Sequence, residues 1–150
     1  MKKIILTVSI GFIATSLLYA CDCTASKNMM KCDYYVGLKH DKTHQKECID
    51  FAKIRDKNFV YGSAARYYLI GGDLKDAKEA AKKAVKIGQN YAYEYLGLAY
   101  LMEKKIEKAK KAFSKLKIKD KKYMKKDIDI LSSIYKDFNK KEAIKLLGLS

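Results

Sequence analysis

Two stretches of this chain, YGSAARYYLIGGDLKDAKEAAKKAV at residues 61–85 and YEYLGLAYLMEKKIEKAKKAFSKLK at 93–117, follow one pattern. The second lies 32 positions after the first, and seven residues recur: Tyr61, Tyr68, Leu69, Ala77, Lys78, Ala80 and Lys83 return as Tyr93, Tyr100, Leu101, Ala109, Lys110, Ala112 and Lys115. A period near this length is typical of helical hairpins that stack side by side. The repeat therefore predicts an all-α fold, a helical-hairpin array of the α-solenoid type.

The rest of the chain carries the same helical signals. Proline is absent, and apolar residues recur at helical spacing. Residues that cap helix N-termini precede several segments: Asp73, Asn90, Asp120 and Asn139. Gly72 and Gly88 follow others, where a left-handed residue ends a helix. We expect helices near 26–38, 43–56, 58–70, 74–87, 90–103, 106–118, 121–136 and 140–148.

Residues 58–150 resemble the tetratricopeptide repeat (TPR) family. The second unit carries the pattern most fully, as Tyr93-x2-Leu96-Gly97-x2-Tyr100 followed by Ala109-x3-Phe113. The resemblance implies units near 58–89, 90–123 and 124–150. A degenerate, cysteine-bearing hairpin at 21–57 would precede them, for three to four hairpins in all. Residues 88–100 are also similar, more distantly, to Sel-one-like repeats.

The resemblance also implies a partner-binding groove, because TPR arrays line their concave face with the first helix of each hairpin. Carried onto this sequence, the lining residues include Phe59, Arg66, Leu69, Tyr91, Glu94, Leu98 and Leu101. Such a mixture suits an extended or helical peptide. The alternative is that several of these side chains simply pack against the neighbouring hairpin.

The first twenty residues have the layout of a secretory signal. Lys2 and Lys3 precede an uncharged run that continues to Cys21. Leu18-Tyr19-Ala20-Cys21 resembles a bacterial lipobox, which implies lipidation at Cys21 and a membrane-anchored lipoprotein. Two alternatives are ordinary cleavage, which gives a soluble periplasmic protein, and a retained membrane helix. Loss of 1–20 would lower the net charge from +15 to +13.

All four cysteines lie before residue 50. In an exported protein, cysteines indicate disulfides. Cys32 lies 33 positions before Ala65, where a hairpin needs a small packing residue, and Cys48 falls on the following helix. An antiparallel hairpin would bring the two together, so we expect a Cys32–Cys48 disulfide. Reduced thiols at both positions, or a crossed pairing with Cys21 and Cys23, are the alternatives.

No catalytic constellation emerges from the sequence. Ser133-x2-Lys136 matches the serine–lysine pair of penicillin-recognising enzymes, but it lies in a lysine-rich helix without their other motifs. His40 and His44 straddle an expected turn. We therefore expect a non-enzymatic scaffold or adaptor at the cell envelope, without metal or cofactor, whose partner is an unidentified protein or peptide. The alternative is a small thiol or metal protein that uses the N-terminal cysteines and histidines.

Nucleic acid is an improbable partner despite the positive charge. Only Arg55 and Arg66 among the 32 basic residues are arginine. Arginine supplies the planar forks that recognise phosphates and base edges, whereas lysines spread along helices more often cover solvated faces.

Overall fold

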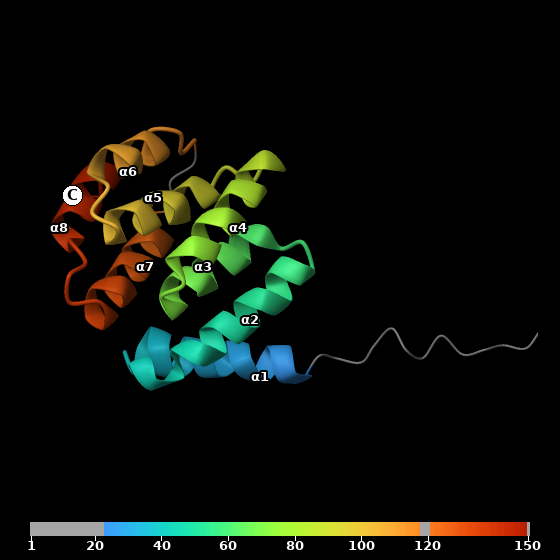
Figure 1. The fold of residues 1–150 in the computed structure, drawn as a ribbon. Helices are drawn as coiled ribbons and strands as arrows, with labels where there is room; N and C mark the ends of the chain where they lie inside the picture. Colours follow the sequence, from blue (N-terminus) through green and yellow to red (C-terminus); the bar gives the residue numbers. More distant parts are fainter. Residues whose placement is uncertain (1–22, 118–120, 150) are drawn as a thin grey trace, which may run out of the picture.

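The structure, a computed structural model, describes residues 23–117 and 121–149. Within these ranges every regular element is a helix, as the repeat predicts (Figure 1). The elements are α1 (Cys23–Lys31), η1 (Cys32–Leu38), η2 (Lys42–His44), α2 (Gln45–Lys57), α3 (Tyr61–Gly71), α4 (Leu74–Lys86), α5 (Ala92–Met102), α6 (Ile106–Phe113), α7 (Lys121–Ile134) and α8 (Lys140–Leu147).

Consecutive helices pack as hairpins: α1–η1 with α2, α3 with α4, α5 with α6, and α7 with α8. The expected caps form at two of these helices. Asp73 accepts a hydrogen bond from the Asp76 N–H at 3.0 Å, and Asn139 accepts one from the Glu142 N–H at 3.0 Å. Gly72 and Gly88 both have φ of 88°, the left-handed conformation expected after a helix. Asn90 caps nothing, because α5 begins two residues later, and Asp120 lies outside the described residues.

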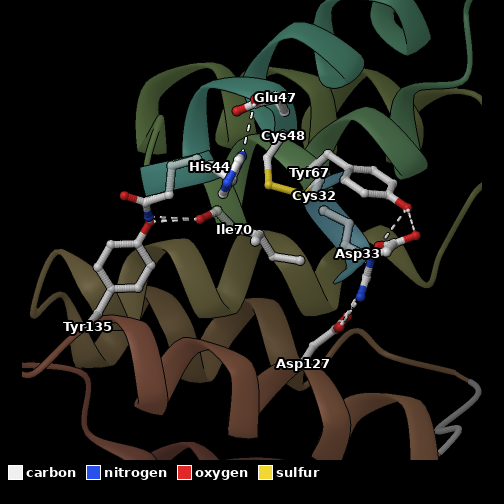
Figure 2. Close-up of a disulfide and its surroundings, with 11 residues drawn as sticks. Cys32, Asp33, His44, Glu47, Cys48, Tyr67, Ile70, Asp127 and Tyr135 are labelled. Carbon is white, nitrogen blue, oxygen red and sulfur yellow. Dashed lines mark hydrogen bonds and ion pairs between the residues drawn. A yellow bond between two sulfur atoms is a disulfide. The ribbon is translucent and has the colours of Figure 1, made fainter. Parts of the chain in front are cut away.

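Three predicted helices differ from the observed ones by three or more residues or in their type. The helix expected at 106–118 ends at Phe113. The helix expected at 58–70 begins only at Tyr61, because Phe59 has a φ of 61° that no α-helical residue adopts. The helix expected at 26–38 starts earlier, at Cys23, and changes to a π-helix at Cys32. Cys32 is joined to Cys48 by a disulfide, with Cα atoms 4.9 Å apart (Figure 2), so the change of helix type occurs at the covalent link to α2.

The two repeats are equivalent in their packing as well as in sequence. Gly97 lets α6 approach α5, since a Cβ at this position would lie 2.2 Å from the Phe113 ring. The expected small and aromatic packing residues are buried: Ala65, Tyr68, Ala77, Ala109 and Phe113. These five positions agree with the close packing expected of a helical hairpin, whereas Tyr100, the counterpart of Tyr68, is only partly buried.

Tyr61 and Tyr93, at equivalent positions of the two repeats, each lie under a lysine. Both rings are only partly buried; Tyr61 lies under Lys83 of α4, and Tyr93 lies under Lys115, two residues after the end of α6. The Lys83 Nζ is 5.3 Å from the centre of the Tyr61 ring, and the Lys115 Nζ is 5.5 Å from that of Tyr93. The same cation–π contact thus recurs 32 positions on. These lysines cover aromatic rings and are not merely solvated.

Helix α7 lies beside α3 and contacts η1 of the N-terminal hairpin (Figure 1). Asp127 of α7 accepts from Arg66 of α3, with Oδ1 2.9 Å from Nε and 2.8 Å from Nη2. Directly after α7, the Tyr135 hydroxyl donates to the Ile70 carbonyl at 2.9 Å and accepts from the Gln45 amide at 2.6 Å. Because its middle is tied to α3 and its C-terminal end to α3 and α2, α7 closes the array into a compact body.

Candidate functional site

The structure buries most of the predicted groove. Leu69, Leu98, Leu101 and Glu94 are each at most 5% exposed. Packing of α3 against α5, together with α7, takes the surface that the TPR resemblance assigns to a partner. In this structure these four side chains are buried within the chain, which favours the alternative interpretation of packing against neighbouring helices; a role in partner binding stays a prediction.

Arg66, predicted to contact a partner, is already paired within the chain. Its guanidinium binds Asp127 and lies 3.6 Å from Asp33, whose carboxylate also accepts from the Tyr67 hydroxyl at 3.0 Å (Figure 2). Burial alone would lower the pKa of Arg66, but the Asp127 carboxylate outweighs it and raises that pKa. Arg66 joins η1, α3 and α7, so a partner would have to displace Asp127 to reach it.

The other two predicted residues are accessible. Phe59 lies in the turn between α2 and α3 and is 73% exposed, and Tyr91 is 45% exposed. Tyr91 belongs to two adjoining pockets of roughly 610 and 460 Å³. Both pockets are also lined by Tyr95 and Tyr123, at the N-terminal ends of α5 and α7. We name this surface the tyrosine groove and define it by Tyr91, Tyr95 and Tyr123, with Met124 and the buried Glu94 in the larger pocket.

Local sequence sets the position of Tyr91. The missing side chain of Gly62 makes room for the tyrosine, because a Cβ there would lie 2.2 Å from the Tyr91 hydroxyl oxygen. The Gln89 side-chain carbonyl accepts from both the Gly62 N–H and the Tyr91 hydroxyl, each at 3.2 Å. The Tyr91 ring then meets Tyr95 edge to face, with centroids 6.3 Å apart. Gly62, Gln89 and Tyr95 thus position Tyr91 as a wall of the groove, although its half-exposed ring can still move outward.

The walls of the groove are uncharged and its rim is basic. Burial raises the pKa of both Tyr91 and Tyr95, so their phenols stay neutral at physiological pH. Lys117 lines the larger pocket and Lys126 the smaller one. Arg55 is close by, since its Nε donates to the hydroxyl of Ser63, a residue that also lines the smaller pocket, at 3.3 Å.

Of the N-terminal cysteines and histidines, those that the structure describes do not gather into one site. Cys32 and Cys48 form the expected disulfide inside the core, while Cys23 is exposed and Cys21 lies outside the described residues. The His44 ring stacks on Tyr35 at 3.9 Å and contacts Glu47 at 3.2 Å, whereas His40 is exposed in the turn. In the part of the chain that the structure describes, no three His, Cys, Asp or Glu side chains are placed to hold a metal ion.

Comparison with protein-family models, with curated proteins and with solved structures finds no match to this chain. Across residues 23–117 and 121–149, no helix has the length and apolar character needed to span a membrane.

Sequence reasoning missed several residues that shape the site. Asp127 and Tyr123 lie in the third repeat, where the family pattern is weakest, and Arg55 lies on the helix before the first full repeat. Tyr95 is visible in the sequence as an aromatic residue off the packing face of its helix. That off-face position was the one available signal for the groove.

Proposed function

We propose that this chain is a non-catalytic, exported, TPR-like protein that binds a protein partner through the tyrosine groove and acts as a scaffold or adaptor at the bacterial cell envelope. The observation that carries this proposal is the groove itself. Tyr91 and Tyr123 remain 45% and 66% exposed beside a sizeable pocket, in a molecule whose other large aromatic residues mostly enter the core or its margin. Tyrosines supply much of the binding energy of protein interfaces because they are large, amphipathic and have few rotatable bonds.

The side chains that line the groove are suited to binding a peptide. Its walls are neutral phenols and the Met124 side chain, and the nearby amides of Gln89 and Asn90 offer both donors and acceptors. The pocket volume is enough to hold one or two apolar side chains of a peptide. These groups bind and orient, and none of them is an obvious nucleophile with an adjacent base.

Export is part of the same proposal and rests on the N-terminal sequence. The signal-like segment ending in Leu18-Tyr19-Ala20-Cys21 supports passage across the inner membrane, with a lipid anchor at Cys21. The buried Cys32–Cys48 disulfide agrees with an oxidising compartment.

The test is crosslinking in living cells from a photoreactive amino acid placed at Tyr91 or, separately, at Tyr123. Leu38 is the matched control, because it is 64% exposed and lies at the end of η1, toward the opposite end of α7. We expect both groove positions to capture one and the same segment of a partner protein, identified by mass spectrometry, and Leu38 to capture none. Capture from Leu38 equal to that from the groove would contradict the proposal, as would captured segments that differ between the two groove positions.

A further inference from the structure

We infer that the partner segment is acidic: an apolar side chain enters the larger pocket of the tyrosine groove while a neighbouring carboxylate binds Arg55. This inference rests on the proposed function and adds the chemistry of the ligand.

Of the two arginines of the chain, Arg66 lines the groove, whereas Arg55 lies beside it and contacts Ser63, a residue of its wall; the two also differ in their partners. Arg66 lines the smaller pocket and is held by the Asp127 carboxylate. Arg55 donates its Nε to the neutral Ser63 hydroxyl and lies with its guanidinium 5.8 Å from the Phe51 ring centre. Among the described residues, no carboxylate lies within ion-pair distance of Arg55. The Ser63 bond uses one of five guanidinium donors, so the rest of the fork can bind a carboxylate of the partner.

The lysines at the rim of the groove resemble Arg55 in that no carboxylate of the described residues pairs with them. Lys117 and Lys126 line the two pockets, and neither forms an ion pair with any described residue. The acidic groups nearby are already engaged or enclosed. Asp33 and Asp127 bind Arg66, and Glu94 is buried in the larger pocket. The rim therefore attracts negative charge, whereas the buried Glu94 carboxylate disfavours a second acid inside, which assigns the pocket to an apolar side chain.

The shape of the groove favours a peptide over a single-stranded nucleic acid. Tyr91 and Tyr95 meet edge to face, with an interplanar angle of 87°, and therefore form a corner. Successive bases need open aromatic faces on which to stack. A corner beside a pocket instead accepts one compact side chain, with the flanking backbone passing along the rim.

The experiment compares labelled peptides of one design with the purified protein. Each peptide places a leucine or phenylalanine beside two glutamates, and its counterparts carry glutamine or lysine in place of glutamate. An oligothymidylate of similar length serves as the nucleic-acid probe. We expect the acidic peptides to bind about tenfold more tightly than the glutamine versions, a difference of about 1.4 kcal/mol, since a hydrogen bond between two charged groups is stronger than one to a neutral amide. The advantage should shrink as salt rises.

Substitution of single residues tests whether Arg55 binds the glutamate side chain of the peptide. Arg55→Gln should remove most of the preference for acidic over glutamine peptides while leaving the affinity for the glutamine peptides unchanged. Lys53→Gln, the same charge change on an exposed position of the same helix, should leave the preference intact. Tyr91→Ala should lower the affinity for the acidic peptides and for the glutamine peptides by the same factor.

Three results would overturn the inference: equal binding of acidic and glutamine peptides, no binding of acidic peptides at millimolar concentration, or tighter binding of the oligothymidylate. Equal binding that Tyr91→Ala abolishes would leave the proposed function standing and remove only the acidic specificity. The proposed function itself fails only if the crosslinking from Tyr91 and Tyr123 also fails.

Discussion

Gly62 and Gly97 are both helical glycines, and at each an added Cβ would lie 2.2 Å from an aromatic side chain. The consequences differ because the neighbours differ. The Phe113 ring beside Gly97 is buried within the hairpin, whereas Tyr91 beside Gly62 is half exposed and can swing outward. One glycine therefore serves the fold, and the other serves the groove.

This difference predicts that the same substitution affects mainly stability at Gly97 and mainly the groove at Gly62. Gly97→Ala should lower the free energy of unfolding by about 1–3 kcal/mol, as overpacking of a closed core does. Gly62→Ala should cost less than ~1 kcal/mol, because Tyr91 can move, but it should reduce crosslinking from the groove. Urea denaturation and the crosslinking yield measure the two effects. A Gly62→Ala variant that is as destabilised as Gly97→Ala would show that Tyr91 is locked in place.

Because of Tyr135, the free energy of unfolding should fall as the pH rises through the alkaline range. Burial raises its pKa from 10.0 to about 12, against the opposing hydrogen bond from Gln45. The fold thus favours the neutral phenol, and the resulting stability is complete below pH 10 and lost as pH rises through about 12. Tyr68, with a pKa also raised to about 12 by burial, acts in the same direction.

We therefore expect the urea midpoint to fall between pH 10 and pH 12. Tyr135→Phe should cost about 1 kcal/mol at neutral pH, through the lost hydrogen bond to Ile70, and should make the alkaline fall shallower. An equally steep fall in wild type and Tyr135→Phe would contradict this role.

At the scale of helices, hairpin pairing follows from the repeat, while the N-terminal hairpin depends on a covalent tie. The disulfide joins η1 to α2, and both its cysteines are buried. The next residue, Asp33, contacts Arg66 and Tyr67. The disulfide therefore holds η1 where Asp33 can complete the contact between α3 and α7.

Loss of the disulfide should destabilise the protein by about 3 kcal/mol, given the 16-residue separation of the two cysteines. A Cys32→Ala, Cys48→Ala double variant should melt at lower temperature than wild type and no longer respond to reductant. Peptide mapping under non-reducing conditions should recover the linked pair. Mapping that joins Cys23 to either residue would refute the pairing.

At the scale of helices, the sequence also shows where local reasoning stops. Periodicity and caps located the helices of 58–117, because those signals lie within each element. The start of α3 was missed because the left-handed Phe59 is neither glycine nor asparagine. The π-helix at Cys32 was missed because it arises at a link to a distant residue.

At the scale of the whole molecule, the hairpin array and the disulfide could be predicted, but the closed concave face could not. The contacts that close it join residues far apart, such as Arg66 with Asp127 and Gln45 with Tyr135. No periodic pattern encodes such pairs, and the family resemblance favoured an open groove. Only Phe59 and Tyr91 of the predicted lining remain accessible, so the candidate site shifts to the groove at the ends of α5 and α7.

Attachment of the whole molecule to a membrane is a separate prediction. Mass spectrometry of the mature N-terminus should find Cys21 as the first residue, carrying lipid, and Cys21→Ala should release the protein from the membrane fraction. An unmodified Cys21 in a membrane-free periplasmic fraction would contradict the lipid anchor and would favour a soluble periplasmic protein.

The central claim is that α7 occupies the face that the repeat pattern assigns to a partner. A double-mutant cycle on Arg66 and Asp127, measured by urea denaturation, tests it most directly. Asp127→Ala alone should cost about 3 kcal/mol, because it leaves the buried Arg66 guanidinium with only the more distant and more exposed Asp33 carboxylate. Together with Arg66→Ala, it should give a coupling energy of at least ~2 kcal/mol. Additivity of the two substitutions within about 0.5 kcal/mol would mean that α7 does not pack there and that the concave face is open.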